Sequence, residues 1–211
     1  MSWLIETILN GLITGSIYAL VGSGIALVYG TTRVLNFAHG ELIMIAGYLV
    51  LFFTVTLGWN VWLASFLTLV MVAGAGALLQ RATIAPLLAR DDWAFRVIAA
   101  TIGLSIFLQS GAQLVWGEQF RTLPYFFNGV AVIGDVRMPW QRIAILVIAL
   151  LIMAASALVL YRTPLGRMVR ATAQDAEAAL AVGIPSGLVH TAVFAISAVL
   201  AGAGAILLSP L

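Results

Sequence analysis

The first group of side chains that could do chemistry in this sequence lies in the run from Asn36 to Glu41. This run places an amide, an imidazole and a carboxylate within six residues. A metal site is not expected, because His39 and Glu41 are two residues apart and diverge on a helix, and no other residue supplies ligands. Two interpretations remain. Asn36 caps a helix whose dipole Glu41 complements, or Asn36, His39 and Glu41 form a hydrogen-bonded knot around an ionisable group at membrane depth.

A second polar stretch, Arg162 to Pro185, lies between two long apolar segments. Thr163-Pro164 predicts the start of one helix, and Asp175 and Gly183 predict the cap and the end of a second, both along the membrane surface. One face of the second helix is expected to be small and apolar, with two acidic residues toward its positive end. The apolar positions are Ala176, Ala179, Leu180 and Gly183, and the acidic ones are Asp175 and Glu177. Such a face suits a groove on another protein or, alternatively, the lipid interface.

Two apolar segments also carry polar residues at four-residue intervals, which place them on one helix face. The first set is Asn10, Thr14, Tyr18 and Gly22, joined by Gly11 and Gly15, and the second is Thr101, Ser105, Gln109 and Gln113. Both faces should meet protein or water rather than lipid. They either pack helices together through small residues and amides or line a route across the membrane.

The elements that must position these residues are membrane helices. With 63% hydrophobic and 9% charged residues and a mean hydropathy of +1.10, the chain has more apolar surface than a soluble domain can bury. Continuous apolar runs without strict alternation exclude a barrel. We therefore expect an all-α, polytopic helical bundle forming one transmembrane domain over residues 1–211. The expected spans are 5–29, 41–57, 60–79, 97–116, 142–160 and 188–208.

Arginine placement predicts the orientation. With the amino terminus outside, the loops at 30–40, 80–96 and 161–187 face the cytoplasm and hold seven arginines, against three outside. The inner set is Arg33, Arg81, Arg90, Arg96, Arg162, Arg167 and Arg170, and the outer set is Arg121, Arg137 and Arg142. No cleavable signal is expected, so Met1 is interpreted as the mature end. Val130 to Met138, with Gly134-Asp135 in its middle, predicts a small external hairpin.

Glu177-Ala178-Ala179 followed by Gly183 resembles the EAA loop of bacterial ABC importer permeases. The later Ile and Leu-Pro elements of that broader pattern are absent at the expected distance. The resemblance implies that the loop at about 161–187 contains a cytoplasmic coupling helix that docks an ATPase. The docking residues would be Asp175, Glu177, Ala178, Ala179, Leu180 and Gly183.

A second resemblance is narrower. Tyr29-Gly30 and the run Asn36, Phe37, Ala38, His39, Gly40 and Glu41 are similar to the signature after the first span in permeases of the branched-chain amino-acid ABC importer family. Permeases for urea and short amides look similar in the same places. Family members continue beyond a sixth span, so the chain looks like the first two thirds of such a permease. The polar stripes would then line the substrate pathway, with the Asn36–Glu41 knot at its cytoplasmic end.

This resemblance implies a multi-pass protein of the bacterial cytoplasmic membrane that imports branched-chain amino acids. It implies ABC ATPase subunits, a second homologous permease and an extracytoplasmic substrate-binding protein as partners, and no nucleic acid. No cofactor is expected in this chain. ATP and Mg²⁺ would be bound by the ATPase, because the sequence has no lysine and no P-loop motif.

Two rival classes can be weighed against the sequence. A rhomboid-like intramembrane protease needs Gly-x-Ser-Gly, but Gly103-Leu104-Ser105 is followed by Ile106, and His-Glu-x-x-His is absent. We therefore expect no enzyme. An ion-coupled secondary transporter needs acidic residues at mid-membrane, whereas Glu6, Glu41 and Glu118 all lie near predicted span ends.

Overall fold

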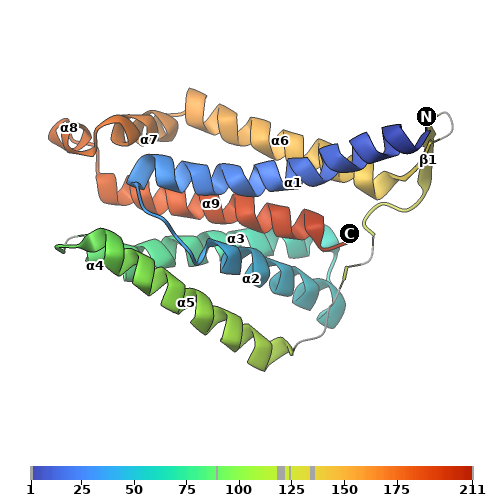
Figure 1. The fold of residues 1–211 in the computed structure, drawn as a ribbon, viewed down its shortest axis with the longest axis horizontal. Coiled ribbons are helices and arrows are strands. Elements are labelled where there is room, and N and C mark those ends of the chain that lie inside the picture. The colour runs from blue at the N-terminus through green and yellow to red at the C-terminus, as the bar shows by residue number, and fades with distance from the viewer. Residues whose placement is uncertain (1, 89, 118–121, 124, 134–135, 211) are drawn as a thin grey trace.

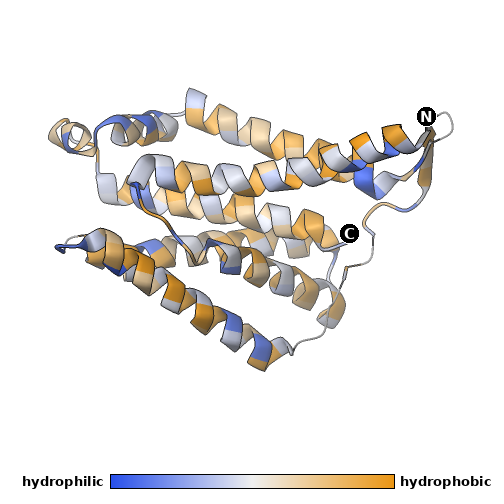
Figure 2. Cartoon of the chain, viewed as in Figure 1, coloured by the Kyte–Doolittle hydropathy of each residue, from blue (hydrophilic) through white to orange (hydrophobic). Residues whose placement is uncertain are grey.

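The computed structural model describes residues 2–88, 90–117, 122–123, 125–133 and 136–210. Within these ranges, six helices are long and apolar enough to cross a membrane, which confirms the predicted all-α bundle and its six spans (Figure 1). Four of them are single helices: α1 (Ser2–Thr32), α5 (Trp93–Trp116), α6 (Trp140–Arg162) and α9 (Ser186–Leu208). Hydrophobic residues occur along all the spans (Figure 2), and many large ones are exposed, as expected for a protein solvated by lipid.

The other two spans contain wide turns. Helix α2 (His39–Leu51) continues into the π-helical turn η1 (Phe52–Thr56). Helix α3 (Val61–Leu79) continues through a second π-helical turn, η2 (Gln80–Ile84), into α4 (Ala85–Leu88). Gln80 in η2 is buried and accepts a hydrogen bond of 2.8 Å from Thr191 of α9, so this wide turn is tied to the neighbouring helix.

Helix α9 lies at the centre of the bundle, between α1 on one side and α2 and α3 on the other (Figure 1). Glycines on the neighbouring helices let their backbones come close to α9. A Cβ added to Gly76 of α3 would lie 2.6 Å from the carbonyl oxygen of Phe194, and one added to Gly24 of α1 would lie 3.0 Å from that of Ser197. The first contact leaves no room for a side chain and the second is tight, as is usual where membrane helices pack through glycine.

The remaining helices pack around this centre. Helix α6 lies along α1, where Ile13 and Ile17 meet Ile145 and Ala149 in one buried cluster. Helix α5 contacts α2 and α4 and diverges from the rest of the bundle (Figure 1). Among the described residues, one side of α5 therefore has no helix beside it.

The two ends of the bundle differ. At one end lie two short helices, α7 (Pro164–Gln174) and α8 (Ala176–Ala181). At the opposite end, near the amino terminus, strands β1 (Val130–Ile133) and β2 (Val136–Pro139) form an antiparallel hairpin in which Val130 pairs with Pro139 (Figure 1). The predicted hairpin is confirmed, and its predicted turn residues Gly134 and Asp135, like Arg121, lie outside the described residues.

Candidate functional site

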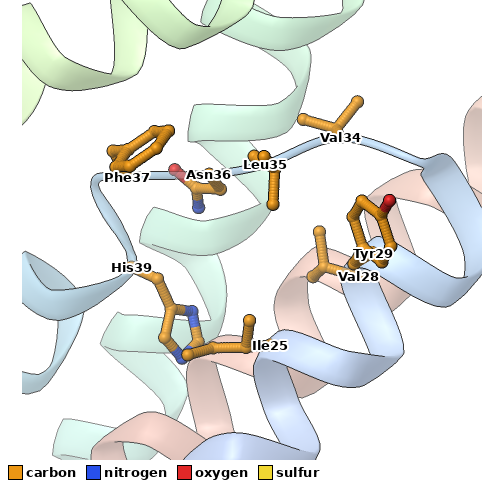
Figure 3. A pocket seen from close by; sticks show the side chains of 8 residues that line it. All are labelled: Ile25, Val28, Tyr29, Val34, Leu35, Asn36, Phe37 and His39. Atoms are coloured by element: carbon orange, nitrogen blue, oxygen red, sulfur yellow. The ribbon is translucent and has the colours of Figure 1, made fainter.

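The segment from Arg33 to Ala38 folds back into the bundle instead of crossing its surface. Helix α1 ends at Thr32, and Arg33 adopts a left-handed conformation with φ of 56°. The chain then runs back to His39, the first residue of α2 (Figure 3). We call residues 33–38 the re-entrant loop.

Its depth follows from the partners of His39. The ring Nδ1 lies 3.4 Å from Ser197 Oγ, and Ser197 donates a hydrogen bond of 2.8 Å to the carbonyl oxygen of Gly24. Gly24 precedes the end of α1 by eight residues, about 12 Å of helix. Ser197 is the twelfth of the 23 residues of α9. Helix α2 therefore begins at mid-bundle, and the non-helical backbone before it lies at membrane depth.

The polar side chains of the signature bond to separate partners and not to one another. Asn36 Oδ1 accepts a hydrogen bond of 3.1 Å from the Ala38 amide. Glu41 Oε1 accepts one of 2.7 Å from Ser105 of α5. The interpretation as a knot is therefore wrong: the three side chains bond to a local turn, to α9 and to α5. Of the alternative interpretation, Glu41 does lie in the first turn of α2, but Asn36 does not cap that helix, which has no side-chain cap.

Glu41 also corrects a prediction about depth. It was placed near the end of a span, and it does lie in the first turn of α2. Its partner Ser105, however, is the thirteenth of the 24 residues of α5. Because α2 begins inside the bundle, Glu41 is an acidic residue at mid-depth.

A pocket of about 200 Å³ lies between the re-entrant loop and α1 (Figure 3). Its walls are mostly aliphatic and aromatic, and two polar side chains, Asn36 and His39, also line it. Asn36 Nδ2 and His39 Nε2 are buried and have no hydrogen-bond partner. The complete lining is Ile25, Val28, Tyr29, Val34, Leu35, Asn36, Phe37 and His39.

The polar stripe on α1 lies on an uncovered face. Thr14 and Tyr18 are exposed, Tyr18 by 69%, and a Cβ added to Gly11 or Gly15 would meet nothing within 4 Å. Asn10 is the exception, because its Oδ1 accepts a hydrogen bond of 2.6 Å from Arg142 of α6. The interpretation that this stripe packs against the other described helices is therefore wrong. Any partner for the stripe would have to be another segment or another protein.

The polar stripe on α5 divides into two parts. Thr101 is fully buried and its Oγ accepts from the Phe37 amide at 3.3 Å, so with Ser105 it holds the re-entrant loop and α2 against α5. Gln109 and Gln113, two turns further on, are exposed. The inner pair has a structural role, and the outer pair remains available to solute or to another protein.

The surface helix α7 is anchored firmly to the bundle end. Thr163 caps it by accepting a hydrogen bond of 3.1 Å from the Gly166 amide, as predicted. Gly166 packs so closely on the last turn of α6 that a Cβ there would overlap the Leu160 carbonyl. On the same helix, Val169 joins a buried cluster that contains Val28 of α1 and Phe194 of α9. Helix α7 is thereby coupled to three membrane helices.

Helix α8 is the projecting element (Figure 1). Asp175 caps it by accepting from the amides of Glu177 and Ala178 at 3.0 and 2.9 Å, as predicted. Gly183 ends it with φ of 86°, while the amides of Gly183 and Ile184 bond to the carbonyls of Leu180 and Ala179. This is a Schellman motif, in which the left-handed position favours glycine.

The apolar positions predicted on one face of α8 differ in burial. Ala179 is buried because it packs inward, whereas Ala176 and Leu180 are exposed. Leu180 (60%) and Val182 (78%), beside Glu177, are the large apolar side chains exposed here.

The chain matches, over residues 7–210, the family described as the permease component of the branched-chain amino acid transport system. The chain belongs to this family. The permease is 34% identical to the high-affinity branched-chain amino acid transport system permease protein BraD of Pseudomonas aeruginosa, over 97% of its own length and 70% of that of BraD. It is 30% identical to the corresponding LivH protein of Escherichia coli K12, over 98% of its own length and 70% of that of LivH. No solved structure is significantly similar to it.

Two residues of the permease site were missed in the sequence. Ser197 and Gly24 hold His39 in place, yet neither belongs to a motif. Ser197 did leave a signal, since it is an isolated hydroxyl within a long Ala-rich apolar span and a polar group there needs a partner. Gly24 left none beyond its small size.

Proposed function

We propose that this permease is the membrane subunit of an ATP-driven importer of branched-chain amino acids, with Asp175–Gly183 as the ATPase-docking segment. The observation that carries the proposal is the family match over residues 7–210, together with relatives whose names describe high-affinity branched-chain amino acid transport. The permease itself performs no catalysis in this proposal. ATP and Mg²⁺ are held by the ATPase subunits, since the chain has no P-loop motif.

The proposed orientation puts α7 and α8 in the cytoplasm of a bacterial cell and the amino terminus outside. All seven arginines of the predicted inner loops belong to the bundle end that carries α7 and α8. Arg137 and Arg142 lie at the other end, in β2 and the start of α6. An excess of arginine on one side favours retention of that side in the cytoplasm.

The anchoring of α7 supports a coupling role for α8. A force applied to Leu180 or Val182 passes through the capped junction at Asp175 to α7, and from α7 to α1, α6 and α9. Such an arrangement suits a protein whose spans rock when two ATPase subunits close. A second permease and an extracytoplasmic binding protein complete the proposed transporter.

The pocket beside the re-entrant loop supports hydrophobic amino acids over urea. Ile25, Val28 and Val34 give it aliphatic walls, which suit a branched side chain that urea lacks.

An ion-coupled carrier is the second candidate, because Glu41 lies at mid-depth, where acidic residues often bind coupling ions. Measuring leucine uptake into vesicles distinguishes the importer from the ion-coupled carrier. Transport that stops when the ATPase is inactivated and continues when ion gradients are collapsed supports the importer, and the reverse result supports the carrier.

The docking segment is tested by changing its exposed apolar side chain. With the cognate ATPase co-expressed, Leu180→Arg should prevent co-purification, because a charge would enter an apolar groove. Gln174→Arg is the matched control, since Gln174 is exposed on the same loop but outside α8. If the Leu180→Arg protein still co-purifies with the ATPase, the docking site lies elsewhere.

A further inference from the structure

The pocket between α1 and the re-entrant loop combines three features that no structural role accounts for. A helix begins at mid-bundle, an imidazole beside it is buried with one nitrogen unpartnered, and an amide donor beside both is also unpartnered. Buried polar atoms without partners are costly, and a ligand that bonds to them is one way of satisfying them.

The hydrogen bonds of Ser197 define what His39 offers to a ligand. The single hydroxyl proton of Ser197 is donated to the Gly24 carbonyl at 2.8 Å. The ring Nδ1 of His39, 3.4 Å from the same oxygen, therefore carries the proton of the neutral imidazole. His39 Nε2 is left as an acceptor, and the side chain that carries it is only 5% exposed.

Asn36 offers the opposite chemistry. Its Oδ1 is engaged by the Ala38 amide, which fixes the orientation of the side chain. Its Nδ2, with two protons and no partner, points from the loop into the space between His39 and Val28 (Figure 3). The start of α2 at His39 has no side-chain cap, so the positive end of the helix dipole also lies beside the pocket.

We propose that this pocket binds the zwitterionic head of a branched-chain amino acid on its way through the permease, an inference that rests on the proposed function. The substrate ammonium donates to His39 Nε2, and the substrate carboxylate accepts from Asn36 Nδ2 at the positive end of α2. The aliphatic side chain lies against Ile25, Val28 and Val34. The volume of about 200 Å³ suits a molecule smaller than the drug-sized ligands of 300–1,000 Å³ pockets.

The position of the pocket agrees with a route along α1. Thr14, Tyr18, Ile25 and Tyr29 are separated by four, seven and four residues and share one exposed face of α1. The first two belong to the predicted pathway stripe, and the last two line the pocket. A solute that follows the stripe from the amino-terminal end reaches the re-entrant loop.

A photoreactive diazirine analogue of leucine tests the proposal without any change to the protein. The complete transporter, reconstituted in vesicles with its ATPase and binding protein, is illuminated during uptake, and the labelled peptides of the permease are identified by mass spectrometry. The expected label lies on residues 25–29 or 34–37 and is competed by leucine but not by leucinamide, which lacks the carboxylate.

Variants then separate recognition from folding. Asn36→Ala and His39→Leu should each reduce labelling about tenfold or more, as expected for a lost hydrogen bond to a charged group. Thr68→Val is the matched control and should leave labelling unchanged, because Thr68 is likewise buried with an unpartnered hydroxyl but does not line the pocket.

The outcomes distinguish this subsite from the importer itself. ATP-dependent uptake with label elsewhere, for example around Gln109 and Gln113, would overturn the subsite and leave the importer intact. If both pocket variants take up leucine and are labelled as strongly as the parent, the subsite is likewise overturned and the importer stands. An absence of ATP-dependent uptake would instead remove the proposed function on which the subsite rests.

Discussion

Ser105 of α5 donates a hydrogen bond of 2.7 Å to the carboxylate of Glu41, and this bond joins the first turn of α2 to the middle of α5. Helix α5 otherwise diverges from the bundle, and this bond is one of the polar links that hold it (Figure 1). Another is the hydrogen bond that the Phe37 amide donates to Thr101 Oγ.

Removing the hydroxyl should therefore loosen α5. Ser105→Ala leaves a partly buried carboxylate without its donor, and we expect the free energy of unfolding to fall by about 1–3 kcal/mol. Thermal unfolding in detergent, followed by circular dichroism, measures the change. Ser156→Ala is the control, because Ser156 bonds only within its own helix, to the Ile152 carbonyl. Equal melting temperatures for the two variants would contradict a holding role.

The end of α8 should depend on glycine at position 183. Gly183→Ala places a Cβ at φ of 86°, which costs about 1–2 kcal/mol and should fray α8 and weaken ATPase binding. Gly183→Asn should be tolerated better, since asparagine adopts left-handed conformations more readily. The affinity of the purified ATPase for each of the two variants measures the effect. Gly187→Ala, an exposed helical position with free space around it, serves as control. A Gly183→Ala protein that binds like the parent would mean that the Schellman motif is dispensable.

The junction between α6 and α7 should tolerate no side chain at Gly166. In Gly166→Ala the new methyl group meets backbone atoms of Val159 and Leu160, which cannot rotate away, and we expect destabilisation of at least about 1–3 kcal/mol. The yield of monodisperse protein in detergent reports the effect. Gly103→Ala should behave like the parent, since nothing lies within 4 Å of a Cβ there. Normal yield of Gly166→Ala would show that α7 can shift without cost.

The two exposed amides of α5 remain candidates for the pathway. Gln109→Leu combined with Gln113→Leu should lower uptake by the complete transporter without lowering assembly, because both side chains are exposed and bond to no neighbour that holds the fold. Thr101→Val is the contrasting variant: Thr101 is fully buried and bonded to the re-entrant loop, so its loss should reduce stability first. Unchanged uptake in the double variant would exclude Gln109 and Gln113 from the route.

The sequence predicted the parts of this structure that local physics controls. Long apolar runs gave the six spans, and the caps at Thr163 and Asp175 and the stop at Gly183 follow from the few atoms around each residue. The hairpin from Val130 was predicted in the same way.

Depth and partners were not predictable in this manner. Hydropathy reports how long a span is but not where it begins along the bundle, so Glu41 was assigned to a membrane surface although Ser105 holds it at mid-bundle. Gly11, Gly15 and Gly22 of α1 lay on a stripe with two possible roles, helix packing or a route across the membrane, whereas the close approaches to α9 in the described residues use Gly24 and Gly76. Which of several glycine-rich faces meets a neighbour depends on the arrangement of all six helices.

The central position of α9 has a consequence for biogenesis. The ribosome makes α1, α2, α3 and α6 before the helix that fits between them, so these segments enter the bilayer while the notch at Gly76 and the groove beside Gly24 are still open to lipid. The close contacts of Gly24 and Gly76 can form only after α9 has been made. We therefore expect a chain that stops before Ser186 to leave both glycine faces uncovered.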